Sequence, residues 1–360
     1  MSMDSTRNIC ETGEKAGGRT GQYPDGRPYC SLPLFLRQQF GGPLYKLSLN
    51  GGMSCPNRDK TVGDGGCIFC SAGGSGEFAA DAGLSVSEQI AQARRRAEAK
   101  AEKASGGRQK DTGNGEGGGR KEKGNPARYI AYFQAYTNTY APPERLERIF
   151  TEALRPEDVA VLSIATRPDC LGEPVIRLLD RLAEKKPVWV ELGLQTMHEE
   201  TAIRIRRGYA LPCFEQAVRR LQAGGHMVIV HMILGLPGES REQMAATARY
   251  LGDLGVDGVK LQLLHILKGT VLGEWYERGQ VSVMEKEEYF AAVAACLQVL
   301  PRRTVIHRLT GDGPKELLLA PFWSRDKKRV LNELHHYLKI HGIWQGQNLA
   351  GRHAVATPEQ

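Results

Sequence analysis

The chain has no stretch of about 18 uncharged apolar residues, the length that a membrane-spanning helix needs. Its first residues, MSMDSTRNICETGEK, lack the basic segment followed by an apolar segment that marks a secretory signal. With 41% hydrophobic and 25% charged residues, the composition is that of a globular protein, and 360 residues can bury a sizeable core. We therefore expect a cytoplasmic protein in a reducing compartment, without contact to a membrane.

Several common catalytic motifs are also missing. The chain contains no GxGxxG fingerprint at a strand–helix turn, no Walker loop and no HExxH zinc motif. Eight cysteines in 360 residues are too few for a disulfide scaffold, and five of them are scattered along the chain. We interpret these five as small, partly buried apolar residues: Cys10, Cys30, Cys170, Cys213 and Cys296.

Net charge is low outside one segment. The chain carries 48 Lys and Arg against 41 Asp and Glu, a formal charge of +7. Residues 94–128 hold eleven basic and five acidic residues, so they contribute six of the seven excess charges. The remaining chain is close to neutral, and charge alone therefore gives only a weak indication of a nucleic-acid partner.

Glycine-rich and polar stretches divide the chain. Residues 1–30 show no hydrophobic period, which predicts a flexible N-terminal tail. Residues 105–127 hold many glycines and few apolar side chains, which predicts a disordered low-complexity insert. We expect a core over residues 31–310 that contains this insert, followed by a C-terminal extension over residues 311–360.

Between these stretches, short apolar segments alternate with amphipathic ones, a pattern typical of βα units around a parallel sheet. Strands are predicted at 45–49, 129–133, 159–164, 187–192, 227–233, 258–264 and 304–307. Helices are predicted at 34–40, 85–104, 143–154, 173–184, 199–207, 213–223, 240–254, 285–299 and near 325–339. The predicted fold is α/β, a partial (open) βα barrel of about six parallel strands with helices outside. Functional groups should follow the carboxyl ends of its strands.

Three cysteines lie close together in the glycine-rich segment GGMSCPNRDKTVGDGGCIFCSAGGSG. Two residues separate Cys67 from Cys70, a spacing that lets both sulfurs face one point, and the loop can bring Cys55 back to meet them. Three thiolates leave one position of a cluster open, whereas a closed structural zinc site needs four ligands. Structural zinc and unrelated free thiols are the alternatives. Phe69 lies between the paired cysteines, where its ring is suited to stack on an adenine.

Further segments extend this pattern over residues 35–338. They are CPNR (55–58), CIFC (67–70), YFQAYTNTYAP (132–142), ATRPDCL (165–171), WVELGLQT (189–196), RRGY (206–209), HMILGLPGE (231–239), VKLQLLHILKGT (259–270) and HRLTGDGP (307–314). With them, the chain resembles the radical S-adenosylmethionine superfamily. Within it, the chain is similar to the YhcC/YtqA-type proteins, relatives of the radical domain of the catalytic Elongator subunit. The gap between Cys55 and Cys67 is longer than the superfamily's commonest CxxxCxxC spacing and fits this subgroup.

The resemblance implies a 4Fe-4S cluster held by Cys55, Cys67 and Cys70, with S-adenosylmethionine bound to the open iron. One electron then splits the sulfonium into methionine and a 5′-deoxyadenosyl radical, which abstracts hydrogen from an unactivated carbon. A donor such as flavodoxin or ferredoxin is implied as the source of the electron. The task of the protein is to position the reactants and to exclude water.

The resemblance also implies cofactor-binding residues after the strands, although it assigns no catalytic residue. Gln134 and Thr137 occupy the position of the superfamily's Gly-Gly-Glu motif, which is absent here, and a polar turn is the alternative. Arg167 is expected to orient a ribose or carboxylate, with an ion pair at a helix start as the alternative. Glu191 and Gln195 lie in the region with which relatives hold the ribose or carboxylate of the cofactor.

The Elongator relationship implies a substrate, the wobble uridine of tRNA. The implied reaction remodels a carboxymethylaminomethyl side chain at the uridine C5 position toward an aminomethyl one. Two other functions fit the sequence. One is a radical enzyme acting on a small metabolite, with which the nearly neutral charge outside residues 94–128 is consistent. The other is a zinc-stabilised RNA-binding protein without catalysis.

Overall fold

A computed structural model of the chain describes residues 21–349, apart from positions 75, 77, 107–126 and 312. Its centre is one parallel sheet with the strand order β1-β2-β3-β4-β5-β6-β8. The strands are β1 (Leu44–Leu49), β2 (Arg128–Phe133), β3 (Val159–Thr166), β4 (Val188–Gln195), β5 (Met227–Leu234), β6 (Gly258–Leu263) and β8 (Val305–Arg308). A short antiparallel pair lies outside it, β7 (Ile266–Leu267) and β9 (Leu318–Ala320).

The sheet curves into an open half-barrel, because β1 and β8 stand at its two edges and do not pair with each other. The predicted fold class is confirmed, and the number of strands is seven rather than about six. The seventh strand, β8, has only four residues and joins β6 with a register shift after Val259. The sequence analysis predicted this strand at 304–307, and its pairing with β6 places it at the edge of the sheet.

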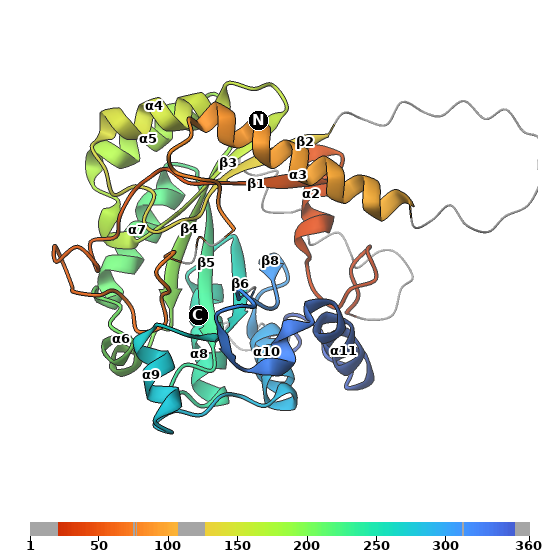
Figure 1. Cartoon of the computed structure of the whole chain (residues 1–360). Coiled ribbons are helices and arrows are strands. Elements are labelled where there is room, and N and C mark those ends of the chain that lie inside the picture. The colour runs from red at the N-terminus through yellow and green to blue at the C-terminus, as the bar shows by residue number, and fades with distance from the viewer. Residues whose placement is uncertain (1–20, 75, 77, 107–126, 312, 350–360) are drawn as a thin grey trace, which may run out of the picture.

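Helices cover the convex side of the sheet (Figure 1). The helices of the described residues are α2 (Leu32–Phe40), α3 (Val86–Gly106), α4 (Pro143–Leu154), α5 (Glu173–Ala183), α6 (Glu199–Arg204), α7 (Leu211–Ala223), α8 (Arg241–Asp253), α9 (Val271–Glu277), α10 (Lys286–Val299) and α11 (Lys327–Ile340). Of these, α2 packs instead against the amino end of the barrel. Two 3₁₀ turns are η2 (Pro168–Cys170) and η3 (Phe322–Arg325). Helix α9 was not predicted; the other helices lie close to their predicted ranges.

Helix α4 shows why these segments pack as they do. Its apolar residues recur three and four positions apart, so Leu146, Ile149, Phe150 and Ala153 share one face and are buried. Phe150 meets Phe133 of β2 with ring centroids 5.2 Å apart. Pro at the first helical position suits this start, because its missing N–H would have no partner in the first turn.

The strands bury both faces, and the two faces belong to different cores. Along β2, Tyr129, Ala131 and Phe133 point to the core beneath the outer helices. Ile130 and Tyr132 point into the barrel. This explains why the strands read as nearly continuous apolar runs. Polar side chains inside the barrel are therefore exceptions that call for a partner.

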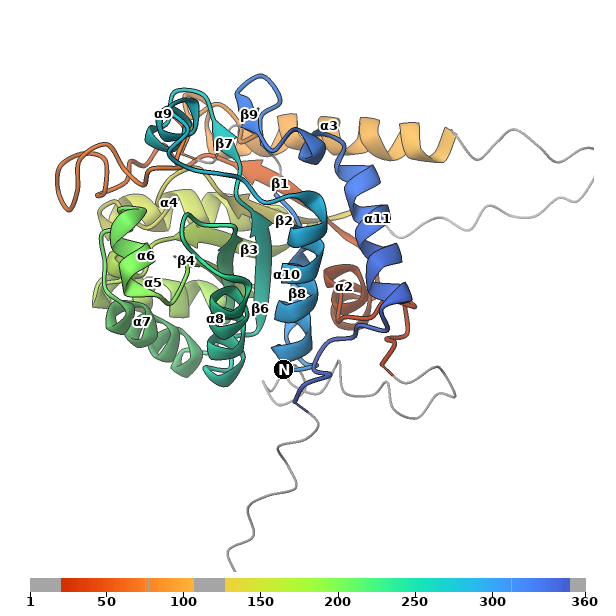
Figure 2. The same ribbon diagram turned by 90° about the horizontal axis from the view of Figure 1, so that it is seen from below.

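Helix α2 closes the amino end of the barrel. Ser31 caps the helix, and its hydroxyl accepts a hydrogen bond from the Leu34 N–H at 3.2 Å. Phe35 packs against Trp189 near the start of β4, with ring centroids 6.1 Å apart. The helix also lies against β8 (Figure 2). The barrel interior is therefore sealed at this end and accessible from the carboxyl edge and from the gap between β1 and β8.

Residues 21–30 differ from the predicted tail. Tyr23 is 3% exposed, and its hydroxyl donates to the Arg302 carbonyl at 2.8 Å. The Cys30 N–H donates to the Gln345 side chain at 2.8 Å, and the Ile306 N–H donates to the Cys30 carbonyl at 2.7 Å. Long-range contacts hold this segment, and a local pattern of glycine and polar residues gives no sign of them. Residues 1–20 lie outside the described part.

The structure does not test two other predicted divisions of the chain, the insert at 105–127 and the extension that begins at residue 311. The predicted insert at 105–127 lies outside the described residues except at its two ends. In the predicted extension, α11 buries Val330, Leu334 and Leu338 in the main core. A division of the chain at residue 311 stays a prediction. Within the described ranges, no helix combines the length and apolarity that crossing a membrane requires.

Replacing Tyr23 by Ala should lower the free energy of unfolding by about 3 kcal/mol, because it removes a buried ring and leaves a cavity. Urea denaturation followed by circular dichroism measures the change. The control is Phe322→Ala, at a ring that is 62% exposed, which should change stability by less than about 0.5 kcal/mol. Equal effects of the two substitutions would mean that residues 21–30 do not pack in solution.

Candidate functional site

The three clustered cysteines lie in the loop between β1 and α3, at the carboxyl edge of the sheet. Asn57 anchors this loop: its side-chain amide donates to the Arg206 carbonyl at 2.6 Å and lies 3.5 Å from the Cys67 sulfur. Gly208 makes room for this contact, because a Cβ there would stand 2.5 Å from the Asn57 side-chain oxygen. The φ of Gly208, 82°, also favours glycine.

Arg58 holds the other end of the loop. Its guanidinium donates to the carbonyls of Cys70, at 3.0 Å, and Ser71. It also lies over the ring of Tyr136, 5.6 Å from the centroid. The Tyr136 hydroxyl donates to the carbonyl of Ala72. The cysteine segment is thus tied to the end of β2, which precedes Tyr136.

Of the two paired cysteines, Cys67 loses its proton more readily than Cys70. The hydrogen bond from Cys70 is the largest cause that lowers the pKa of Cys67 to about 7. The charges of Arg167 and Arg58 and the amide of Asn57 act in the same direction, and burial opposes them. The pKa of Cys70 is raised by the same hydrogen bond and by burial. When this pair of thiols loses its first proton, the negative charge therefore lies on Cys67.

Thiolates are the donors that iron–sulfur clusters use, so the type of side chain in this loop, though not its arrangement in this structure, suits such a cluster. Cys55, Cys67 and Cys70 are half-buried free thiols, and Cys55 is near enough to Cys70 to act on its pKa. Burial also raises the pKa of Cys170, a cysteine outside the loop, to about 12. Among the residues that the structure describes, no three His, Cys, Asp or Glu side chains are arranged so that they could hold a metal ion. The ligand role of the three cysteines stays a prediction.

Arg167 lies beside the cysteine loop, at the end of β3. Its guanidinium pairs with Asp169 at 2.7 Å and donates to the Arg207 carbonyl at 2.8 Å. This is the ion pair that the sequence offered as an alternative, and it coexists with an electrostatic influence on Cys67. A role for Arg167 in binding a cofactor stays a prediction.

Arg207, which the sequence analysis did not single out, lies beside Arg167 and holds the carboxyl end of β4 through hydrogen bonds. It is almost completely buried, and it donates to the carbonyls of Thr196, at 2.7 Å, and Tyr209, at 3.0 Å. Arg167 and Arg207 both lie over the Tyr209 ring, 5.1 and 4.6 Å from its centroid. The RRGY segment was recognised only as part of a resemblance, and no local pattern reveals that its second arginine is buried.

Gln195 ends β4 in an unusual backbone conformation. Its φ is 64°, and the pairing of β4 with β5 shifts between Gly193 and Gln195. A Cβ at Gly193 would stand 2.6 Å from the amide nitrogen of Gln195. The hydroxyl of Tyr209 donates to the Gly193 carbonyl. The bulge directs Gln195 to the carboxyl edge, where its predicted role in cofactor binding stays a prediction.

Three further predicted residues occupy different surroundings. Thr137 is buried, and its N–H donates to the Ser54 carbonyl at 3.3 Å, which links the end of β2 to the cysteine loop. Gln134 lines the large cavity described below. Phe69 is partly buried against the cluster that contains Ile68. Their contacts with a cofactor are not tested and stay predictions.

Glu191 lies inside the barrel, on β4, with both carboxylate oxygens engaged. One oxygen accepts from the Ser163 hydroxyl at 2.9 Å and lies 3.5 Å from the Lys46 ammonium. The other accepts from His231 at 2.7 Å and from Lys260. The sequence analysis expected Glu191 to bind the cofactor; the structure gives it protein partners, and the cofactor role stays a prediction. Its apolar neighbours along β4 gave no sign of these partners.

The pKa values of the ionisable side chains in this interior network differ strongly from their ordinary values. Two nearby lysines hold the pKa of Glu191 well below its usual range, although burial works against them. Burial, with the charge of Lys260, lowers the pKa of His231 to about 4. Burial also lowers the pKa of Lys260 to about 7. At neutral pH, His231 is therefore uncharged and donates its Nε2–H to an ionised Glu191.

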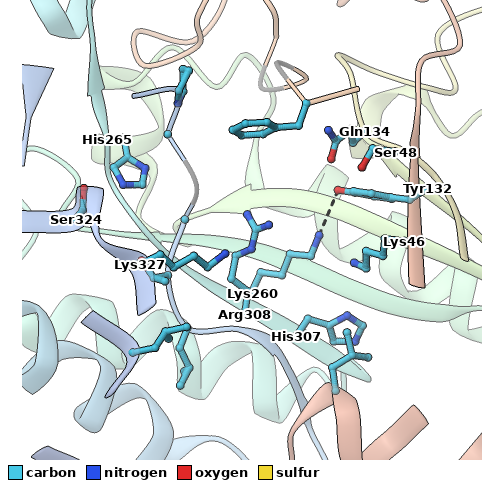
Figure 3. Close-up of a pocket in the computed structure, with 18 of the residues that line it drawn as sticks. Lys46, Ser48, Tyr132, Gln134, Lys260, His265, His307, Arg308, Ser324 and Lys327 are labelled. Carbon is cyan, nitrogen blue, oxygen red and sulfur yellow. Dashed lines mark hydrogen bonds between the residues drawn. The ribbon is translucent and has the colours of Figure 1, made fainter. Parts of the chain in front are cut away.

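A cavity of about 2430 Å³ opens beside this network, at the gap between β1 and β8 (Figure 3). Side chains from α3, α11 and the segment 309–318 complete its walls. Its described lining includes two acidic residues, Glu316 and Asp326. It also includes eight basic ones: Arg27, Lys46, Arg96, Lys260, Arg308, Lys315, Arg325 and Lys327. The cavity thus attracts anions.

The open half-barrel with a three-cysteine loop at its carboxyl edge defines a class of α/β enzyme scaffold, and comparisons identify the family. Residues 61–251 match the radical SAM superfamily, and residues 256–340 match the Radical SAM C-terminal domain. The chain belongs to the radical SAM superfamily, and the resemblance seen in the sequence is confirmed.

The chain is 41% identical to YtqA of Bacillus subtilis over 89% of its own length and 92% of that protein. It is 28% identical to the tRNA uridine(34) acetyltransferase of Methanocaldococcus jannaschii, over 51% of this chain and 33% of that protein. The solved structure of Methanocaldococcus infernus Elp3 shares the fold, with a TM-score of 0.53 at 19% identity, over 64% of this chain and 60% of that one.

Replacing His231 by Gln should reduce the sensitivity of the protein to acid. The pKa of His231 is about 4 when folded, against 6.5 for an ordinary histidine, so the unfolded chain binds the proton first as the pH falls. The free energy of unfolding therefore decreases from pH 6.5 to pH 4, by at most about 1.4 kcal/mol per pH unit from this group. Urea denaturation at several pH values should show a shallower slope in the variant.

The matched control is His341→Gln, at an exposed position at the end of α11, which should keep the wild-type slope. The glutamine amide at position 231 can still donate to Glu191, so the stability at pH 7.5 should change little. Equal slopes in all three proteins would show that His231 is charged inside the folded barrel.

Proposed function

We propose that this radical SAM superfamily enzyme uses a 4Fe-4S cluster, held by Cys55, Cys67 and Cys70, to act on the wobble uridine of tRNA. When bound, the cluster and S-adenosylmethionine supply a 5′-deoxyadenosyl radical that removes hydrogen from the substrate. The main observation in favour is the cysteine loop at the carboxyl edge, where Cys67 is poised to be a thiolate. An electron donor such as flavodoxin or ferredoxin and a cytoplasmic location accompany this proposal.

The residues around the loop prepare the site. Asn57 and Arg167 favour the negative charge of Cys67, and a thiolate is the form that binds iron. The Thr137 N–H fixes the loop to the end of β2. Arg207 is almost completely buried and lies over the Tyr209 ring in the corner beside the loop, where a radical reaction requires that water be excluded.

Two observations favour RNA over a small metabolite. The cavity is larger than the roughly 300–1,000 Å³ of a typical small-molecule pocket. Its basic lining matches the phosphate backbone of a nucleic acid. The M. jannaschii relative named a tRNA uridine(34) acetyltransferase adds weight, although it shares only about half of this chain. The reaction we propose for that uridine converts a carboxymethylaminomethyl group at C5 to an aminomethyl one: the radical would remove a hydrogen atom from the carboxymethyl carbon, one further electron would return to the cluster, and water would release the carboxymethyl group as glyoxylate.

Anaerobic reconstitution with iron and sulfide should yield a brown protein. With dithionite and S-adenosylmethionine, it should release 5′-deoxyadenosine. Cys67→Ala should reduce both the bound iron and the product at least tenfold, because the cluster loses one thiolate. Cys213→Ala, at a cysteine outside the loop, should behave as wild type. Product formation by Cys67→Ala would contradict the ligand assignment, and a colourless protein with one zinc per chain would support the non-catalytic alternative.

Binding of tRNA should weaken as salt increases, and Lys315→Gln at the cavity rim should make the plot of log K against log salt shallower by about one. The matched control is Lys185→Gln, an exposed lysine that precedes the amino end of β4, which should not alter the slope. Filter binding at several salt concentrations measures both. Identical slopes, together with unchanged wobble nucleosides in tRNA from cells without the gene, would contradict a tRNA substrate.

A further inference from the structure

Three basic side chains converge inside the cavity from separate strands (Figure 3). Lys46 comes from β1, Lys260 from β6 and Arg308 from β8, and we call them the seam cations. The ammonium groups of Lys46 and Lys260 lie 4.7 and 4.8 Å from the centroid of the Tyr132 ring. The Lys260 ammonium also donates to the Tyr132 hydroxyl at 3.2 Å. The two lysines therefore share one small region under this ring.

Two of the seam cations, Lys46 and Lys260, share one carboxylate, that of Glu191. Its oxygens are already shared among four donors. The cations repel one another: after burial, the charges of Lys46 and Arg308 also act to lower the pKa of Lys260. Positive charge in a partly buried place is costly unless an anion matches it.

The geometry leaves room for such an anion. Each lysine ammonium has three N–H donors. The Lys260 ammonium donates to Glu191 and to Tyr132, and the Lys46 ammonium lies 3.5 Å from a Glu191 oxygen. Beside Tyr132, Ser48 and Gln134 add neutral hydrogen-bonding groups (Figure 3). The opening between β1 and β8 admits a ligand to this point.

We propose that the seam cations form an anion-binding subsite that receives one carboxylate or phosphate group of the molecule on which the enzyme acts. The anion-binding subsite itself does not depend on the proposed function. Only the statement that the bound molecule is the substrate rests on that function. Lys46 and Lys260 provide charge and donors, Arg308 adds a third charge, and Glu191 with Tyr132 holds the lysines in place. The substrate thus binds through an anion inside the barrel as well as by contacts at the rim.

Titration of the reconstituted full-length protein with inorganic phosphate, at constant ionic strength in a calorimeter, tests the subsite. Wild type should bind phosphate saturably, and Lys46→Gln and Arg308→Gln should each weaken this binding about tenfold, the loss typical of one charge-assisted hydrogen bond. Lys185→Gln, which removes the same charge from the opposite end of the sheet, should bind as wild type. Circular dichroism shows which variants are folded. Weaker phosphate binding by either folded variant, Lys46→Gln or Arg308→Gln, is enough to support the subsite.

Competition separates the sources of the anion. Uridine 5′-monophosphate should displace phosphate more effectively than uridine if a phosphate group occupies the subsite. Acetate should displace it if a carboxylate does. Displacement by S-adenosylmethionine would assign the subsite to the cofactor and overturn its assignment to the substrate. Absence of saturable phosphate binding, or equal binding by all variants, would overturn the subsite itself. Phosphate binding does not depend on 5′-deoxyadenosine formation, so the subsite and the proposed function can fail separately.

Discussion

Parallel pairing of the strands from β1 to β8, without closure between these two edges, is the constraint on which the rest of the structure depends. Because all seven strands run in the same direction, their carboxyl ends meet at one edge. The loop after β1 with its three cysteines, the end of β3 with Arg167 and the bulge at Gln195 therefore come together. Because the sheet stays open, the barrel interior is reachable from the side, and α2 seals its amino end.

The interior of this half-barrel is unusual because it holds charge. A fully closed βα barrel fills its centre with layers of branched apolar side chains. Here Glu191, Lys260 and His231 project inward from neighbouring strands and satisfy one another. Such a buried network is weak evidence for added stability, since apolar residues of the same size often do as well. Its value lies in the local field, which keeps His231 neutral and surrounds the cavity with positive charge.

Prediction from the sequence succeeded where the signal was local or periodic. Apolar runs and helical spacing gave the strands and most helices within a few residues, and the CxxC spacing singled out the loop that the structure places at the carboxyl edge. Prediction failed where partners are far apart in the chain. Tyr23 is buried by Arg302 and its neighbours, and Arg207 by the end of β4. Glu191 on β4 contacts Lys260 on β6, with β5 between them, and no pattern in either segment predicts this contact.

The sequence by itself therefore determined the α/β class, the family, and the identity of the three thiols, because hydrophobic period and residue spacing are properties of short segments. Only the tertiary structure decided that residues 21–30 pack and that basic side chains from β1, β6 and β8 meet in one cavity. These features depend on which strands become neighbours and where the barrel remains open. That choice follows from packing the whole chain at once, since each contact joins residues that are hundreds of positions apart or on different strands.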